Sequence, residues 1–199
     1  MKRLLAAMVL FSLLSTVSFA NELLSPEQLT RNTADEVLSI LRKDHNITQD
    51  QAQVQRLVDE KVLPYFDFQR MTQLAMGRNW RSASPAQKEE LVKQFRKLLV
   101  RTYSSALQSY SNQTITYLPF HMAPSDTDVV VKTQIKQPGQ QPVPVDYSLE
   151  KTNQGWKVYD IAVDGVSLVT HYRSSFNFEV QRNGVEGLIV VLTKKNQAS

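Results

Sequence analysis

Apolar residues in the first half of the chain recur every three or four positions, which is the period of an amphipathic helix. Two segments begin with a serine that can cap a helix and a proline that suits its first turn, at Ser25-Pro26 and at Ser84-Pro85. Asp67 is a further cap, and Pro64 and Gly77 are expected to end the helices before them. The pattern therefore predicts four helices, over about 25–43, 49–63, 67–77 and 84–110.

From residue 113 onward the period changes to two. The segments TDVVVKTQIK and PVPVDYSLEK alternate apolar and polar residues, which is typical of antiparallel strands with one apolar and one solvated face. Ile115 and Tyr117 predict a shorter strand, and Asn153-Gln154-Gly155 predicts a hairpin turn into the strand WKVYDIAV.

Helical periodicity returns after Asp164-Gly165, and a last helix is expected around 185–192. The residues expected on one face of the first of these helices are Val166, Val169, Tyr172 and Phe176. This order of helices, strands and helices predicts an α+β domain, with the helices packed on one face of a curved antiparallel sheet.

Residues 1–20 have the layout of a secretory signal peptide: two basic residues, an apolar run, and the small residues Ser18 and Ala20 at the end. We expect cleavage before Asn21, which leaves a single domain over 21–199. An uncleaved membrane anchor is the alternative, but the apolar run is too short to span a bilayer comfortably. Because the leader is similar to bacterial ones, we expect the protein in the periplasm of a Gram-negative cell.

Composition and charge narrow the function further. The chain has no cysteine, so an exported domain must take its stability from packing and not from disulfides. Of its 23 basic residues two lie in the leader, so the remainder is nearly balanced by the 19 acidic residues. No basic cluster is longer than a pair, which argues against a nucleic-acid partner.

Metal and nucleophile chemistry find little support in the sequence. His45, His121 and His171 are scattered without the spacing of a zinc site, and we expect no metal and no cofactor. Ser167 follows Gly165-Val166, but the second glycine of a nucleophile elbow is missing. Ser167 is therefore interpreted as a helix N-cap.

Asp160 and Asp164 lie close together at the end of a predicted strand and are the best candidates for acid-base chemistry. Asp164 before Gly165 is explained more simply by a turn, and Asp160 has a nearby basic partner in Arg173. We therefore expect a protein that is not an enzyme. A hydrolase that uses these aspartates with Ser167 is a rival hypothesis.

Three segments together resemble the MlaC (toluene-tolerance) family of periplasmic phospholipid-binding proteins: VLPYFDFQRMTQLAMGRNW, LVKQFRKLLVRTYSSAL and GWKVYDIAVDGVSLVTHYRSSF. The resemblance covers most of residues 25–195. It implies a carrier of glycerophospholipid between the outer and inner membranes, which maintains the lipid asymmetry of the outer membrane. It also implies two partners, an outer-membrane lipoprotein-porin complex and an inner-membrane MCE-domain ABC transporter, and acyl tails held between helices and sheet.

Exposing a methylene group to water costs about 0.8 kcal/mol, so two acyl chains of about sixteen carbons require an enclosed, lipid-sized apolar pocket. We expect its lining on the inward faces near the seam between helices and sheet. The expected lining residues are Phe68, Met71, Leu74, Trp80, Phe95, Leu99, Tyr103, Val129, Val131, Val145, Tyr147, Leu149, Val163, Val166, Val169, Tyr172 and Phe176. Two roles fit Arg173: contact with a phosphate or carboxylate near the mouth, or an ion pair with Asp160.

Apolar stripes at helical spacing are more often ordinary core than pocket. The alternative function is therefore a non-catalytic adaptor or assembly domain of the cell envelope, with a solid interior and a protein partner only. Bound lipid in the purified protein would separate these two hypotheses.

Overall fold

The computed structural model describes residues 24–110 and 112–197, so the predicted signal peptide at 1–20 lies outside the described residues. The helices of the first half begin where the sequence predicts. Ser25 and Ser84 form capping boxes with Gln28 and Gln87, and Asp67 accepts a hydrogen bond from the main-chain N–H of Arg70. The α-helices are α1 (Pro26–Lys43), α2 (Gln51–Lys61), α3 (Phe68–Met76) and α4 (Pro85–Gln108), with 3-10 turns η1 (Ile47–Gln49), η2 (Leu63–Tyr65) and η3 (Gly77–Ser82) between them.

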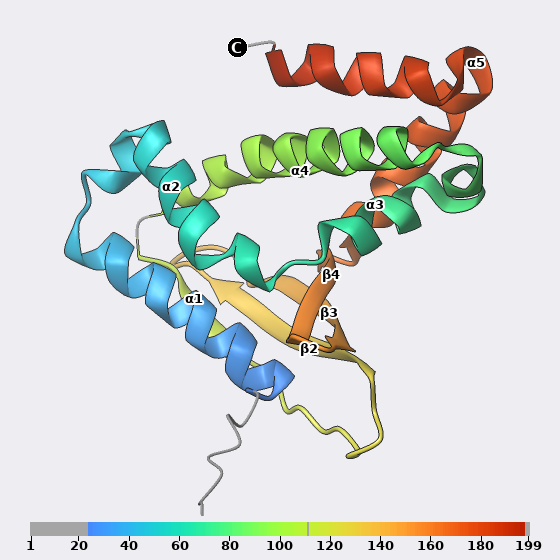
Figure 1. Ribbon diagram of the computed structural model, residues 1–199. Coiled ribbons are helices and arrows are strands. Elements are labelled where there is room, and N and C mark those ends of the chain that lie inside the picture. The colour runs from blue at the N-terminus through green and yellow to red at the C-terminus, as the bar shows by residue number, and fades with distance from the viewer. Residues whose placement is uncertain (1–23, 111, 198–199) are drawn as a thin grey trace, which may run out of the picture.

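The second half forms a five-stranded antiparallel sheet with neighbours in chain order. Its strands are β1 (Thr114–Tyr117), β2 (Asp128–Lys136), β3 (Val143–Thr152), β4 (Gly155–Val163) and β5 (Val166–Ser167). The predicted turn at Asn153-Gln154 joins β3 to β4. Helices and an open, curved antiparallel sheet confirm the predicted α+β class (Figure 1).

One expectation about the chain after β4 is wrong. Val166 does not belong to a helical face with Val169 and Phe176, because Asp164 (φ 50°) and Gly165 (φ 77°) form a tight turn that returns the chain as β5. The helix begins two residues later, as α5 (Leu168–Gln197). Two positive φ angles in succession are typical of a two-residue hairpin turn.

α5 consists of two arms joined at Gly184. The backbone there has φ 69° and ψ −177°, a combination that is essentially restricted to glycine. The second arm, 185–197, folds back and runs beside α4 (Figure 1). α4 is therefore held between α5 on one side and α2 and α3 on the other.

The apolar interior is divided into clusters. The sheet and α1 form one, which contains Leu29, Val131 and Leu149, whereas α3, α4 and α5 form another around Phe95. Phe66, which lies between α2 and α3, packs against both clusters. The helical layer and the sheet layer are thus joined along β4, through Phe66 before α3 and through the start of α5.

The segment that carries Phe66 also occupies part of the outer edge of β4. Phe66 forms an isolated parallel bridge with Val158, and the main-chain N–H of Asp67 donates to the carbonyl of Val158 at 2.9 Å. Because β5 is only two residues long, this contact covers β4 edge groups that β5 does not reach.

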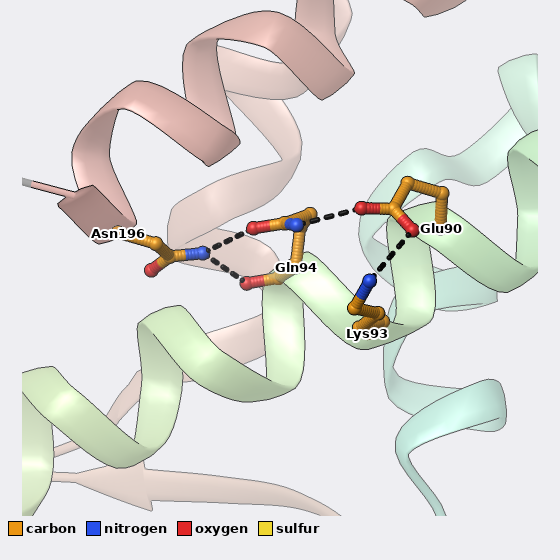
Figure 2. Close-up of polar contacts among 4 residues, drawn as sticks. All are labelled: Glu90, Lys93, Gln94 and Asn196. Carbon is orange, nitrogen blue, oxygen red and sulfur yellow. Dashed lines mark hydrogen bonds and ion pairs between the residues drawn. The ribbon is translucent and has the colours of Figure 1, made fainter.

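A buried polar contact fastens the second arm of α5 onto α4 (Figure 2). The side-chain amide of Asn196 donates to the main-chain carbonyl of Gln94 at 2.9 Å and to its side-chain oxygen at 2.7 Å. Gln94 in turn donates to Glu90 at 2.6 Å, and Glu90 also pairs with Lys93 at 3.3 Å. Asn196 and Gln94 are buried, so each bond is worth more than a surface contact.

We expect Asn196→Ala to lower the free energy of unfolding by about 1–3 kcal/mol, because it removes both hydrogen bonds to Gln94 and leaves the buried side-chain oxygen of Gln94 without this donor. Asn196→Asp should cost more, because a carboxylate would face both Gln94 oxygens. Urea unfolding measures both, with the exposed neighbour change Gln197→Ala as control. Equal midpoints for all three variants would contradict a stabilising role of this contact.

Candidate functional site: the open end of the sheet

The inner face of the sheet, which α1 partly covers, is apolar along its length but not covered to its end. Leu149 and Val145 on β3 have 0% and 5% of their surface exposed. Val163, the partner of Val145 on β4, is 37% exposed, and Val166, the partner of Val163 on β5, is 57% exposed. Directly paired residues of an antiparallel sheet share a face, so burial decreases steadily toward this end.

Exposed apolar side chains therefore mark the uncovered end, and we call this set the rim. We define it as Val143, Val163 and Val166 of the sheet with Tyr103 of α4, all of which are exposed. Tyr103 lies beside Tyr172 in the first arm of α5, the helix that follows β5 directly. Partial burial, followed by the neighbouring Tyr172, raises the pKa of Tyr103 to about 12, so its hydroxyl is protonated at every physiological pH.

Two polar groups lie on the inner face behind the rim. The Thr133 hydroxyl donates to the carbonyl of Val145 at 2.8 Å and is buried. Burial also raises the pKa of Tyr147, whose neighbour is the same threonine. Both groups are neutral, so this surface carries no charge that would repel an apolar ligand.

A β-bulge changes which residues of β4 face inward. Leu149 pairs with Val158 and Ser148 with Asp160, so Tyr159 is the extra residue. Tyr159 packs against the helical cluster and donates to Asp128 at 2.9 Å. Val163 is the only residue of this strand among the expected lining residues. Val158 and Ile161 lie on the same apolar face, because the bulge brings them there in spite of their odd spacing.

The expected lining residues fall into three groups by burial. The members of the first group are at most 9% exposed, so they would form the wall mainly from behind. The buried members are Met71, Phe95, Leu99, Val129, Val131, Val145, Leu149, Val169 and Phe176. The half-buried members are Phe68, Leu74, Trp80, Tyr147 and Tyr172, and the exposed ones are Tyr103, Val163 and Val166.

Arg173 does not pair with Asp160, so that part of the sequence analysis is wrong. Its Nε donates to the main-chain carbonyl of Leu74 at 3.0 Å, which joins α5 to the end of α3. Asp160 instead accepts hydrogen bonds from the Ser167 hydroxyl and from the main-chain N–H of Ile161 and Val169. The carboxylate is thus used to hold the turn and the start of α5.

Ser167 is an N-cap, as predicted: its hydroxyl oxygen accepts from the main-chain N–H of Thr170 at 3.1 Å. Its proton is donated to Asp160, so the pair that a hydrolase would need has a structural role in the turn. Within 24–110 and 112–197 no group of three or more histidine or acidic residues is arranged to hold a metal ion. Over the same residues, no helix is long and apolar enough to cross a bilayer.

Two cavities lie away from the seam between sheet and helices. A small one of about 170 Å³ lies between α4 and the two arms of α5 and includes Tyr172 and Phe176. A larger groove of about 690 Å³ lies along the outer side of α4 and includes Trp80. Trp80 therefore borders a surface groove beside α4, although it was expected in the seam.

The fold and the rim define an α+β protein whose open sheet is only partly covered by helices and offers an apolar surface at one end. The chain belongs to the MlaC family: the family described as MlaC protein matches residues 31–194.

Known proteins agree with this assignment. The chain is 27% identical over 179 residues to the intermembrane phospholipid transport system binding protein MlaC of Haemophilus influenzae, covering 88% of this chain and 82% of that protein. It is 31% identical over 127 residues to toluene tolerance protein ttg2D of Pseudomonas putida, which covers 60% of this chain and 58% of that protein. The solved phospholipid-binding protein of Ralstonia solanacearum, in complex with a phospholipid, is 39% identical with a TM-score of 0.82, covering 87% of this chain and 98% of that one.

Proposed function

We propose that this protein is a periplasmic carrier that moves glycerophospholipids between the outer and inner membranes and so maintains the asymmetry of the outer membrane. The observation that carries the proposal is the apolar rim at the uncovered end of the inner sheet face, where Val163 and Val166 are exposed. It is supported by the Ralstonia solanacearum relative, which has the same fold and was solved with a phospholipid.

In this proposal the acyl tails enter over the rim and lie between the inner face of the sheet and the helical layer. Each methylene removed from water contributes about 0.8 kcal/mol, so most of the affinity comes from how much of the tails is enclosed. The helical and sheet clusters are separate, and the proposal has the two layers move apart between them to admit the tails. The half-buried Phe68, Leu74, Tyr147 and Tyr172 are the proposed first contacts behind the rim.

The headgroup would remain near the mouth, in water. Arg173 is exposed and uses its Nε for the carbonyl of Leu74, so its terminal nitrogens are the proposed contact for a phosphate. No catalytic step is part of the proposal. Asp160 and Ser167 act as turn and cap, and release of the lipid requires only a partner that offers a better apolar site.

The proposed partners are an outer-membrane lipoprotein-porin complex and an inner-membrane MCE-domain ABC transporter. Removal of residues 1–20 by signal peptidase would place the mature domain, 21–199, in the periplasm between them.

Native mass spectrometry of protein purified from the periplasm of a Gram-negative host tests the proposal directly. We expect a chain that begins at Asn21 and carries diacyl glycerophospholipid, whose class follows from extraction and fragmentation. Lipid-free protein that takes up no phospholipid from liposomes would end the carrier proposal and leave the adaptor hypothesis. Ester hydrolysis that disappears in Ser167→Ala would instead favour the hydrolase.

A further inference from the structure

The groove along the outer side of α4 is a concave surface that shares no residue with the rim. Its volume is about 690 Å³, and its walls come from α2, α3, η3 and α4. On α4 it extends from Pro85 to Val100, which is about 22 Å at about 1.5 Å of rise per residue. That length suits a short extended segment or two to four turns of a helix.

The floor of the groove is apolar and its border is charged. Trp80, Val92 and Val100 supply apolar surface, whereas Lys88, Lys93, Arg96 and Lys97 line it with positive charge. The acidic side chains among its lining residues are Asp59 and Glu89. Basic charge is therefore in excess here, in a chain whose charges are otherwise nearly balanced.

The cations are only partly neutralised by the chain itself. Arg96 pairs with Asp59 at 3.3 Å, and Lys93 pairs with Glu90 at the same distance, both on exposed surface. Lys88 lies over the Trp80 ring at 5.4 Å, and neither it nor Lys97 has a carboxylate partner within the described residues. Exposed pairs of this kind contribute little to stability, so these charges remain available to a ligand.

Tryptophan and arginine are the residue types that most often dominate the binding energy of protein interfaces, and both occur here beside an apolar floor. A bilayer presents a broad, nearly flat surface, which touches the border of a groove but does not fill its floor. A protruding peptide segment can contact the border and also fill the floor. The concave shape therefore favours a protein partner over a membrane surface.

From this geometry we propose that the α4 groove is a docking site for an acidic segment of a protein partner, with an apolar or aromatic side chain that packs on Trp80 and Val92. Acidic side chains flanking that anchor would pair with Lys88 and Lys97. Because the groove lies on the outer side of α4 and three of the four rim residues lie on the sheet, a partner in the groove can leave Val143, Val163 and Val166 uncovered. The proposal rests on the proposed carrier role.

The test measures binding of the purified, lipid-loaded full chain to the two membrane complexes named above, each reconstituted in nanodiscs of neutral lipid. The double variant Lys88→Glu/Lys97→Glu reverses the free charges. We expect it to weaken binding to at least one complex by about tenfold or more and to flatten the salt dependence of the remaining affinity. Lipid load, measured on the same samples, should not change.

Lys136→Glu/Lys151→Glu is the matched control, because it makes the same change in net charge at exposed lysines of the sheet. It should alter binding by less than about twofold. Wild-type protein that binds neither complex, or double-variant protein that binds both as tightly as the wild type, overturns the proposal. So does a loss of binding to phosphatidylglycerol vesicles without loss of either complex, which would assign the groove to membrane surfaces. Failure of the carrier role itself would be seen separately, as absence of lipid in the wild type.

Discussion

Val163→Glu is expected to remove bound phospholipid from the protein. Val163 lies on the rim, 37% exposed and paired with the buried Val145, so its side chain borders the path proposed for the acyl tails. An ionised carboxylate placed against a hydrocarbon chain loses hydration without gaining a partner, which costs several kcal/mol. At about 1.4 kcal/mol per tenfold change, lipid affinity should fall by about a hundredfold. Native mass spectrometry and uptake of fluorescent phospholipid measure the change.

Val130→Glu is the matched control for this experiment. Val130 is also a valine on a strand and is 42% exposed, but its neighbours Val129 and Val131 are buried, so it faces away from the helices. The Val130→Glu variant should bind lipid as the wild type does, with the same thermal midpoint. If the two glutamate variants lost lipid equally, or if neither lost any, the inner face would not be the lipid surface.

Phe95→Ala is expected to cost about 3–5 kcal/mol of the free energy of unfolding, the largest stability effect among the variants considered. Phe95 has no exposed surface and lies edge-on to Tyr172 and Phe176, with ring centroids 5.1 and 5.0 Å away. Its removal leaves a cavity among rings that also lose their aromatic contact. Urea unfolding measures the loss, and the folded protein should still carry lipid.

Tyr103→Ala should have the opposite effects: weaker lipid binding and a nearly unchanged free energy of unfolding. Tyr103 lies two helical turns further along α4 and is 38% exposed on the rim, so its truncation should change the urea midpoint little. It should lower lipid affinity measurably in the uptake assay. Loss of lipid in folded Phe95→Ala, together with full occupancy in Tyr103→Ala, would show that the cavity is formed deeper in the helical layer than the rim.

Phe95 and Tyr103 have the same sequence pattern but different surroundings in the fold. Both occupy the apolar face of α4, so helical periodicity gives them the same role. Their burial differs because Tyr172 and Phe176 of α5 enclose Phe95, and no local pattern encodes where α5 crosses α4. Caps and periods are local signals, which is why the starts of α1, α3 and α4 and the alternation of β2 and β3 could be predicted.

Other features depend on one or two residues whose effect is visible only in three dimensions. The bulge at Tyr159 shifts the inward positions of β4 by one residue, so strict alternation from Val163 misassigns Val158. Arg173 finds a main-chain carbonyl and not the carboxylate of Asp160, because the turn at Asp164 directs that carboxylate to Ser167 and Val169. Family resemblance could not supply these contacts, since it identifies similar residues and not their partners.

The segment that bridges to Val158 bears on how the protein behaves when crowded. A strand with free backbone groups along its border invites pairing with a second molecule, and repeated pairing leads to fibres. Here the Phe66–Asp67 stretch occupies part of that border, and β5 pairs with the end of β4. Strand-to-strand polymerisation through this edge is thereby hindered, even though the rim nearby leaves apolar side chains exposed to water.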